Sequence, residues 1–155
     1  MIQIFGFKLV IEINEFQLRI METFKSEIDK LIFIFNIDTI DNKYKSIYSE
    51  LINYIILSKP YLLYKLIKTK NWTVRFEIAT KLENIKHKWL KLKLINKLSI
   101  DSKNLVRAMI SILPSTPLKI VKRLIKDEDK VVSEEAKTND KLMEIYFTLK
   151  EDNYK

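Results

Sequence analysis

The chain of 155 residues contains no cysteine, one histidine, one glycine and three prolines. Without cysteine there is no disulfide, no thiolate metal ligand and no cysteine nucleophile, and this composition fits a cytoplasmic, reducing environment. A single histidine, His87, is too few for a histidine-rich metal centre, and a single glycine, Gly6, excludes a glycine-rich phosphate loop. The scarcity of glycine and proline also disfavours the many hairpins of an all-β fold. We therefore expect a protein that is not an enzyme and needs no metal or cofactor.

Charge is unevenly distributed along the chain. The whole sequence carries 28 Lys and Arg against 20 Asp and Glu, a net charge of +8. Lysine, isoleucine and asparagine are abundant, and all three have AT-rich codons. A genome with that codon bias would raise the lysine content by itself, so the net charge alone is weak evidence for binding of nucleic acid. Residues 51–126, however, hold 17 basic and 3 acidic side chains, whereas residues 1–50 and 127–155 are each net acidic. This asymmetry indicates a localised basic surface.

Apolar residues recur at helical spacing over most of the chain. After residue 15 they are separated by three and four positions in successive short segments, which predicts amphipathic helices joined by short turns. The first of these segments, 16–35, predicts a helix of about twenty residues. Ser58 with Pro60, and Thr116 with Pro117, supply the cap and first-turn proline expected at helix starts. No linker divides the helices, so we expect a single domain over 1–155.

The N-terminal segment 1–13 is almost wholly apolar, and from Phe7 to Ile13 it has the alternation of a β-strand. Gly6 can provide a turn or bulge, so we expect a short strand or hairpin. The segment is too short to span a bilayer and lacks the basic residues and cleavage site of a signal peptide, so no integral membrane insertion is expected. Residues 1–57 are predicted to cap the domain, and the apolar segment also offers a surface for a homodimer.

A helix–turn–helix pattern recurs in the remainder of the chain. Residues 65–75 align without gaps with residues 97–107, which lie 32 positions later. A third copy over 123–132 has a turn that is one residue shorter and places Ala136 where Ala79 lies in the first copy. Each copy reads as a helix ending in an apolar pair, a polar turn, and a second helix.

This pattern resembles HEAT-type and related variant α-solenoid repeats, whose second helix opens with an aspartate, followed by Val-Arg and a small residue. The best match is Asp101, Val106, Arg107 and Ala108; the first copy lacks the acid and the third lacks the arginine. The resemblance covers 58–150 and implies an all-α fold, a right-handed stack of antiparallel helix pairs. It also implies that Asp101 and Arg107 tie neighbouring repeats together and are structural.

The basic block coincides with the repeats. At 100° per residue, Lys86, Lys93 and Lys97 fall within about 40° of one another on a helix, and Trp72 and Trp89 lie in the same region. Lysines can follow a phosphate backbone as point charges, and exposed aromatic rings can stack on unpaired bases. The predicted residues for binding nucleic acid or another partner are Lys65, Lys68, Lys81, Lys86, Lys88, Trp89, Lys93, Lys97, Lys119, Lys122 and Arg123.

Three functions are compatible with such a surface. The favoured one is a non-catalytic helical-repeat module that binds a polyanion, either nucleic acid or a ribonucleoprotein. The second is a protein–protein adaptor or small inhibitor that docks on an acidic or nucleic-acid-binding partner. The third is an enzyme similar to HEAT-like DNA glycosylases that remove alkylated bases, although no motif selects catalytic residues for it. The acidic run 127–129 is interpreted as a solvated helix end, because consecutive helical residues diverge by 100°.

Overall fold

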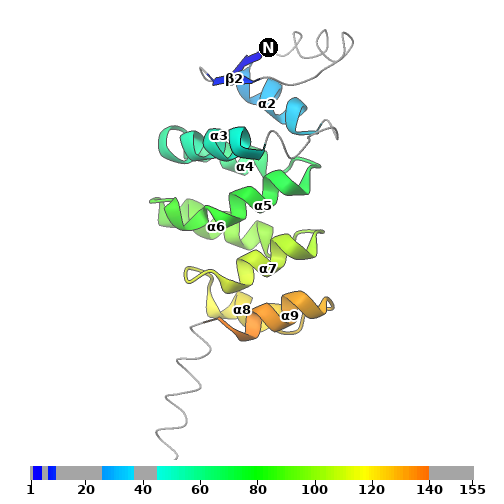
Figure 1. Cartoon of the computed structure of the whole chain (residues 1–155). Coiled ribbons are helices and arrows are strands. Elements are labelled where there is room, and N and C mark those ends of the chain that lie inside the picture. Colours follow the sequence, from blue (N-terminus) through cyan, green and yellow to red (C-terminus); the bar gives the residue numbers. More distant parts are fainter. Residues whose placement is uncertain (1, 5–6, 10–25, 37–44, 140–155) are drawn as a thin grey trace, which may run out of the picture. The chain divides into compact units, whose positions relative to one another are not determined.

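The fold of the chain is predominantly helical (Figure 1). The computed structural model describes residues 2–4, 7–9, 26–36 and 45–139. Within those ranges, all regular structure beyond residue 9 is helical, so the predicted helical fold is confirmed for the described part of the chain. None of the helices in these ranges is both long enough and apolar enough to cross a bilayer.

Contacts divide the chain into two compact units, Met1–Ile78 and Ala79–Lys155. The boundary falls inside helix α5 (Trp72–Thr80). No change in composition marks this boundary, and the prediction of a single domain stays a prediction.

The first unit begins with two short strands. β1 (Ile2–Ile4) and β2 (Phe7–Leu9) pair antiparallel, with Ile2 opposite Leu9 and Ile4 opposite Phe7. Residues 10–13 of the predicted strand lie outside the described residues.

Helix α2 (Glu27–Asn36) is the described part of the predicted helix 16–35 and packs against β1. Its buried residues follow the three- and four-residue spacing of the sequence and are Ile28, Leu31, Ile34 and Phe35. Phe35 packs edge-on against Tyr48 of α3 (Lys45–Ser58), with 4.8 Å between the ring centroids. A large aromatic pair therefore joins the two helices.

The predicted capping roles of Ser58 and Thr116 are wrong. Ser58 is the last residue of α3, and its hydroxyl donates to the Tyr54 carbonyl at 2.7 Å. The Thr116 hydroxyl donates to the Ile110 carbonyl at 2.6 Å. Both side chains thus bond to carbonyls in the last turns of the preceding helix instead of capping the helix that follows. The following prolines still stand at helix starts, Pro60 in the 3₁₀ turn η2 (Pro60–Leu62) and Pro117 just before α8.

After η2 the short helix α4 (Leu63–Leu66) precedes α5. The second unit contains the 3₁₀ turn η3 (Leu82–Asn84) and the helices α6 (Lys88–Leu98), α7 (Asn104–Ile112), α8 (Leu118–Leu124) and α9 (Lys130–Lys137). Within this unit α7 packs against α6, α8 and α9, and α8 also packs against α9. Its core is made of aliphatic side chains from all four helices, among them Leu94, Val106, Ile110, Val121 and Val132.

The helix boundaries repeat along the chain. α5 and α7 are both nine residues long, and they begin 32 positions apart, as the sequence alignment requires. The turns that precede α5, α7 and α9 span 67–71, 99–103 and 125–129 and have equal lengths. The prediction of a shorter third turn is therefore wrong, and Ala136 stands in register with Ile110 rather than with Ala79.

The shorter spacing of the third copy has another origin. α9 begins 26 positions after α7 because α8 has seven residues where α6 has eleven, and because the connection 113–117 is shorter than 81–87, which contains η3. The length difference thus lies before the turn and leaves the length of the turn unchanged.

Candidate nucleic-acid interface

One face of α6 is fixed by its apolar residues. Leu90, Leu94 and Leu98 recur every four residues and are each 8 % exposed or less. Burying a leucine side chain contributes about 1.5–3 kcal/mol, so these contacts set the rotation of the helix about its axis. The side chains of Trp89 and Lys93 consequently face solvent.

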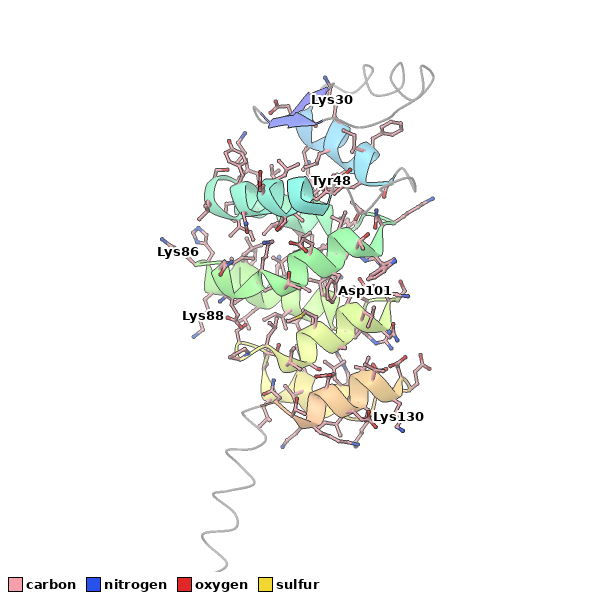
Figure 2. All side chains as sticks on the ribbon, viewed as in Figure 1. Lys30, Tyr48, Lys86, Lys88, Asp101 and Lys130 are labelled. Atoms are coloured by element: carbon pink, nitrogen blue, oxygen red, sulfur yellow. The ribbon has the colours of Figure 1, made fainter. Side chains whose placement is uncertain are left out.

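Lys86 does not belong to this helix. α6 begins at Lys88, and the preceding His87 is extended, with φ −74° and ψ 97°, and makes no side-chain cap. The spacing of 100° per residue therefore applies to Lys93 and Lys97 but not to Lys86, which corrects the sequence-based stripe. Lys86 and Lys88 instead project at the N-terminal end of α6 (Figure 2).

Six exposed lysines on or beside α6 and α8 are together called the α6–α8 basic surface. They are Lys86, Lys88, Lys93 and Lys97 at α6, and Lys119 and Lys122 on α8, and all are exposed. Neither helix contains an acidic residue. Among the described residues, no carboxylate forms an ion pair with Lys86, Lys88, Lys97, Lys119 or Lys122.

Trp89 and Lys93 form a cation–π pair on α6. Lys93 Nζ lies 4.1 Å from the centroid of the Trp89 ring, one helical turn away. Trp89 is nevertheless 68 % exposed. The basic surface thus contains one large aromatic side chain that the core does not bury.

Arg123 was predicted to bind a partner, but it is engaged within the unit. Its NH2 donates to Ser99 Oγ at 2.6 Å and to the Ser99 carbonyl at 3.2 Å. Because Ser99 directly follows α6, this contact places the C-terminal ends of α6 and α8 side by side. Lys91 of α6 is also engaged, since it pairs with Glu83 Oε2 at 3.0 Å.

The other predicted residues belong to the first unit or are half-buried. Lys65 and Lys68 are exposed and belong to the first unit, where Lys68 Nζ lies 5.3 Å from the centroid of the Tyr64 ring. Lys81 is half-buried. Trp72 is half-buried as well and packs edge-on against Phe76, so it takes part in packing.

Arg107 joins the turns that precede α7 and α9. Its Nε and NH2 donate to the two carboxylate oxygens of Asp127 at 2.8 and 2.7 Å, and its NH1 donates to the Asp101 carbonyl at 2.8 Å. Arg75 makes the same contact one copy earlier, since its NH1 donates to the Thr69 carbonyl six residues before it. The two arginines therefore make the same carbonyl contact in equivalent turns.

The interpretation of 127–129 as a solvated run is wrong for two of its three residues. Asp127 is held by Arg107, and Asp129 accepts from Asn104 Nδ2 at 2.7 Å while capping α9 through the amides of Val131 and Val132. The alignment of the repeats could have predicted a structural role for Asp127, because Asp127 occupies the position of Asp101 when the turns are given equal length.

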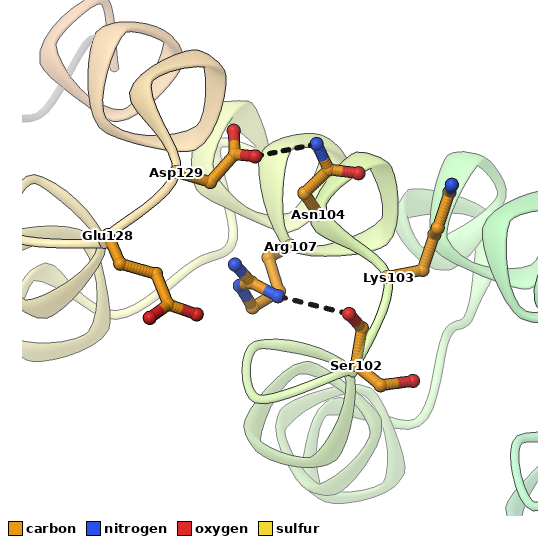
Figure 3. Close-up of a pocket in the computed structure, with 6 residues that line it drawn as sticks. All are labelled: Ser102, Lys103, Asn104, Arg107, Glu128 and Asp129. Carbon is orange, nitrogen blue, oxygen red and sulfur yellow. Dashed lines mark hydrogen bonds between the residues drawn. The ribbon is translucent and has the colours of Figure 1, made fainter.

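An open pocket of about 510 Å³ lies beside these turns (Figure 3). Its lining is polar and consists of Ser102, Lys103, Asn104, Arg107, Glu128 and Asp129. Arg107 and Asp129 are hydrogen-bonded to neighbouring protein groups. Figure 3 shows Arg107 donating to the Ser102 carbonyl and Asp129 accepting from Asn104. In the described part of the chain, no group of three or more histidine or acidic side chains is placed to hold a metal ion.

The hydrogen bonds of Asp127 and Asp129 make the stability of the protein depend on pH. The hydrogen bond from Arg107 holds the pKa of Asp127 below its usual value against the opposing effect of burial, and the Asn104 hydrogen bond lowers the pKa of Asp129. A carboxyl whose pKa is lower in the folded state stabilises the fold fully above its unfolded pKa of about 3.9, and this stability is lost as the pH falls through the folded value. We expect the free energy of unfolding to be flat between about pH 7 and 5 and to fall below about pH 4.

Urea denaturation across this pH range measures the effect. In Asp127→Asn, the decrease on the acid side should be shallower than in the wild type, because the titrating group is absent. If the free energy of unfolding fell equally steeply with decreasing pH in both proteins, the pKa of Asp127 would be the same in the folded and the unfolded state, which would contradict the prediction.

Comparison of the chain with known protein families, with curated proteins and with solved structures gives no match.

Proposed function

We propose that this protein is a non-catalytic helical-repeat module whose α6–α8 basic surface binds a polyanion, with nucleic acid as the favoured ligand. The observation that supports this best is the segregation of charge within the second unit. α6 and α8 carry cations and no acids, whereas Glu128, Glu134 and Glu135 lie on α9 and its preceding turn. Within these two helices no carboxylate competes with a phosphate for the lysines.

Such a surface suits recognition without sequence preference. A lysine ammonium is a compact, hydrated charge that attracts a phosphate from many directions and carries no information about the bases. The binding energy then comes largely from the release of counterions from the nucleic acid, so the affinity depends strongly on salt.

We also infer that the helix pairs stack as a HEAT-like solenoid over 58–150, capped by residues 1–57. The equal turn lengths and the matching carbonyl contacts of Arg75 and Arg107 support a repeated unit. One helix pair cannot bury its apolar face alone, and stacking provides the shared core. In this arrangement the first helices of successive pairs would align the lysines in a row.

A protein–protein adaptor is the second candidate function. It is favoured by apolar side chains that remain exposed on the second helices of the pairs. Leu105 and Ile112 of α7 are 40 % and 38 % exposed, and Val131 of α9 is 47 % exposed. Exposed aliphatic groups on neighbouring helices are typical of protein-binding surfaces.

Lysine footprinting tests the proposed function. The protein is acetylated with and without a random-sequence oligonucleotide at low salt, and the modification of each lysine is read by mass spectrometry. The six lysines of the α6–α8 basic surface should be protected from acetylation, because bound phosphates shield their amines.

Lys130 and Lys137 of α9 are exposed in the same unit and serve as the internal control. Their modification should stay unchanged. Protection of the α9 lysines alone, or of no lysine while the oligonucleotide is bound, would contradict the proposal. Absence of any binding would favour the adaptor.

A further inference from the structure

Trp89 occupies a position that packing does not explain. The indole is 68 % exposed, although its neighbours Leu90 and Leu94 are buried. An exposed tryptophan leaves more apolar surface in water than any lysine or asparagine would at this site. The Lys93 ammonium, 4.1 Å from the ring centroid, covers only part of the ring. The remaining surface is accessible to a ligand.

The two tryptophans of the chain differ in this respect. Trp72 is half-buried, and its ring meets the edge of Phe76 with 6.3 Å between centroids. Trp89 has no such aromatic neighbour among the described residues, and its only ring contact there is the Lys93 cation. Of the two rings, only that of Trp89 combines exposure with surrounding positive charge.

We propose that Trp89 is a stacking platform for an unpaired base, so that the α6–α8 basic surface binds single-stranded nucleic acid in preference to duplex. This inference rests on the proposed polyanion binding. In a duplex, each base is already stacked and paired, and its face is closed to a side chain. In a single strand a base can stack on the indole, which contributes about 1–3 kcal/mol.

The lysines of α6 are placed to assist such stacking. With a rise of about 1.5 Å per residue, Lys93 and Lys97 lie about 6 Å and 12 Å further along the helix axis than Trp89. Lys88 directly precedes Trp89. Cations on both sides of the ring can therefore contact phosphates that flank the stacked nucleotide.

A membrane surface fits these residues less well. An interfacial helix needs a continuous apolar face directed at the lipid, with lysines on the opposite face. The apolar residues of α6 are committed to the core of the unit, since Leu90, Leu94, Ile95 and Leu98 are all buried. Trp89 alone would enter the lipid.

Fluorescence and binding of three ligands test the proposal. In the full-length Trp72→Phe variant, Trp89 is the only emitting tryptophan. An oligo(dT) of about 20 nucleotides, a mixed-sequence duplex of the same length, and vesicles of phosphatidylcholine and phosphatidylserine are titrated at low salt. We expect oligo(dT) to quench Trp89 strongly and the duplex to have little effect.

The Trp89→Ala variant should bind oligo(dT) about 5- to 150-fold more weakly than the wild type, with duplex affinity within about twofold. Trp89→Phe keeps an aromatic face and should retain most of the affinity, which separates stacking from folding defects. Tyr61→Ala removes another exposed aromatic side chain, 65 % exposed in the first unit, and should change nothing.

The outcomes separate the two proposals. Equal affinities for single strand and duplex, both unaffected by Trp89→Ala, would overturn stacking and leave polyanion binding standing. No binding of either oligonucleotide would remove the proposed function itself. A response of Trp89 to anionic vesicles alone would assign the surface to membranes and overturn the inference.

Discussion

Replacing Arg107 with methionine is expected to lower the free energy of unfolding by about 3 kcal/mol. The two side chains of the Arg107–Asp127 pair are only 12 % and 11 % exposed, so solvent cannot replace the lost interaction. The substitution leaves the Asp127 carboxylate without its cation and the Asp101 carbonyl without its donor. For a chain of this size, the melting temperature should fall by about 6–12 °C.

A double-mutant cycle isolates the pair. Urea denaturation compares the wild type with Arg107→Met, Asp127→Asn and the double variant. The double variant should be more stable than the sum of the two single effects predicts. The reason is that, once either partner is lost, the second substitution removes a charge that is already unpaired. Lys130→Met is the matched control, since its pair with Glu134 spans 3.7 Å between side chains that are 87 % and 60 % exposed. It should change stability by less than about 1 kcal/mol. A comparably small effect of Arg107→Met would contradict the structural role.

The helices of the second unit follow from local physical rules. The spacing of Leu90, Leu94 and Leu98 predicts an amphipathic helix, and the helix forms with these residues buried. The 32-residue period likewise agrees with the starts of α5 and α7. Apolar periodicity succeeds here because burial depends on side chains only a few positions apart.

The start of α6 could not be predicted in the same way. No side chain caps the helix at His87, so nothing in the local sequence separates Lys86 from the helical lysines that follow. The same limit applies to Ser58 and Thr116, whose hydroxyls suit a helix start but bond to the helix before them.

The partners of charged residues depend on contacts between distant positions. Asp127 looks solvated in sequence because it stands among other acids, yet Arg107, 20 positions earlier, holds it. Arg123 looks like one more cation of the basic block until Ser99 is seen beside it. The exposure of Lys88 and Lys97, in contrast, was predictable, because both fall outside the leucine stripe of α6.

Charge reversal on α6 is expected to have the largest effect on binding. The Lys88→Glu/Lys97→Glu variant should bind a single-stranded oligonucleotide about a hundredfold more weakly at low salt, because it loses two phosphate contacts and gains two repulsions. Lys130→Glu/Lys137→Glu makes the same change of net charge on α9 and should lower the affinity only a few-fold. Helical circular dichroism should be unchanged in both variants, since all four side chains are exposed.

The dependence of binding on salt tests the central claim most directly. If six lysines neutralise phosphates of a single strand, the logarithm of the association constant should fall with the logarithm of salt with a slope of about −4. The Lys88→Glu/Lys97→Glu variant should give about −3 or shallower, and the α9 variant should keep the wild-type slope. A wild-type slope near zero, or the same slope in the α6 variant as in the wild type, would contradict binding by the α6–α8 basic surface.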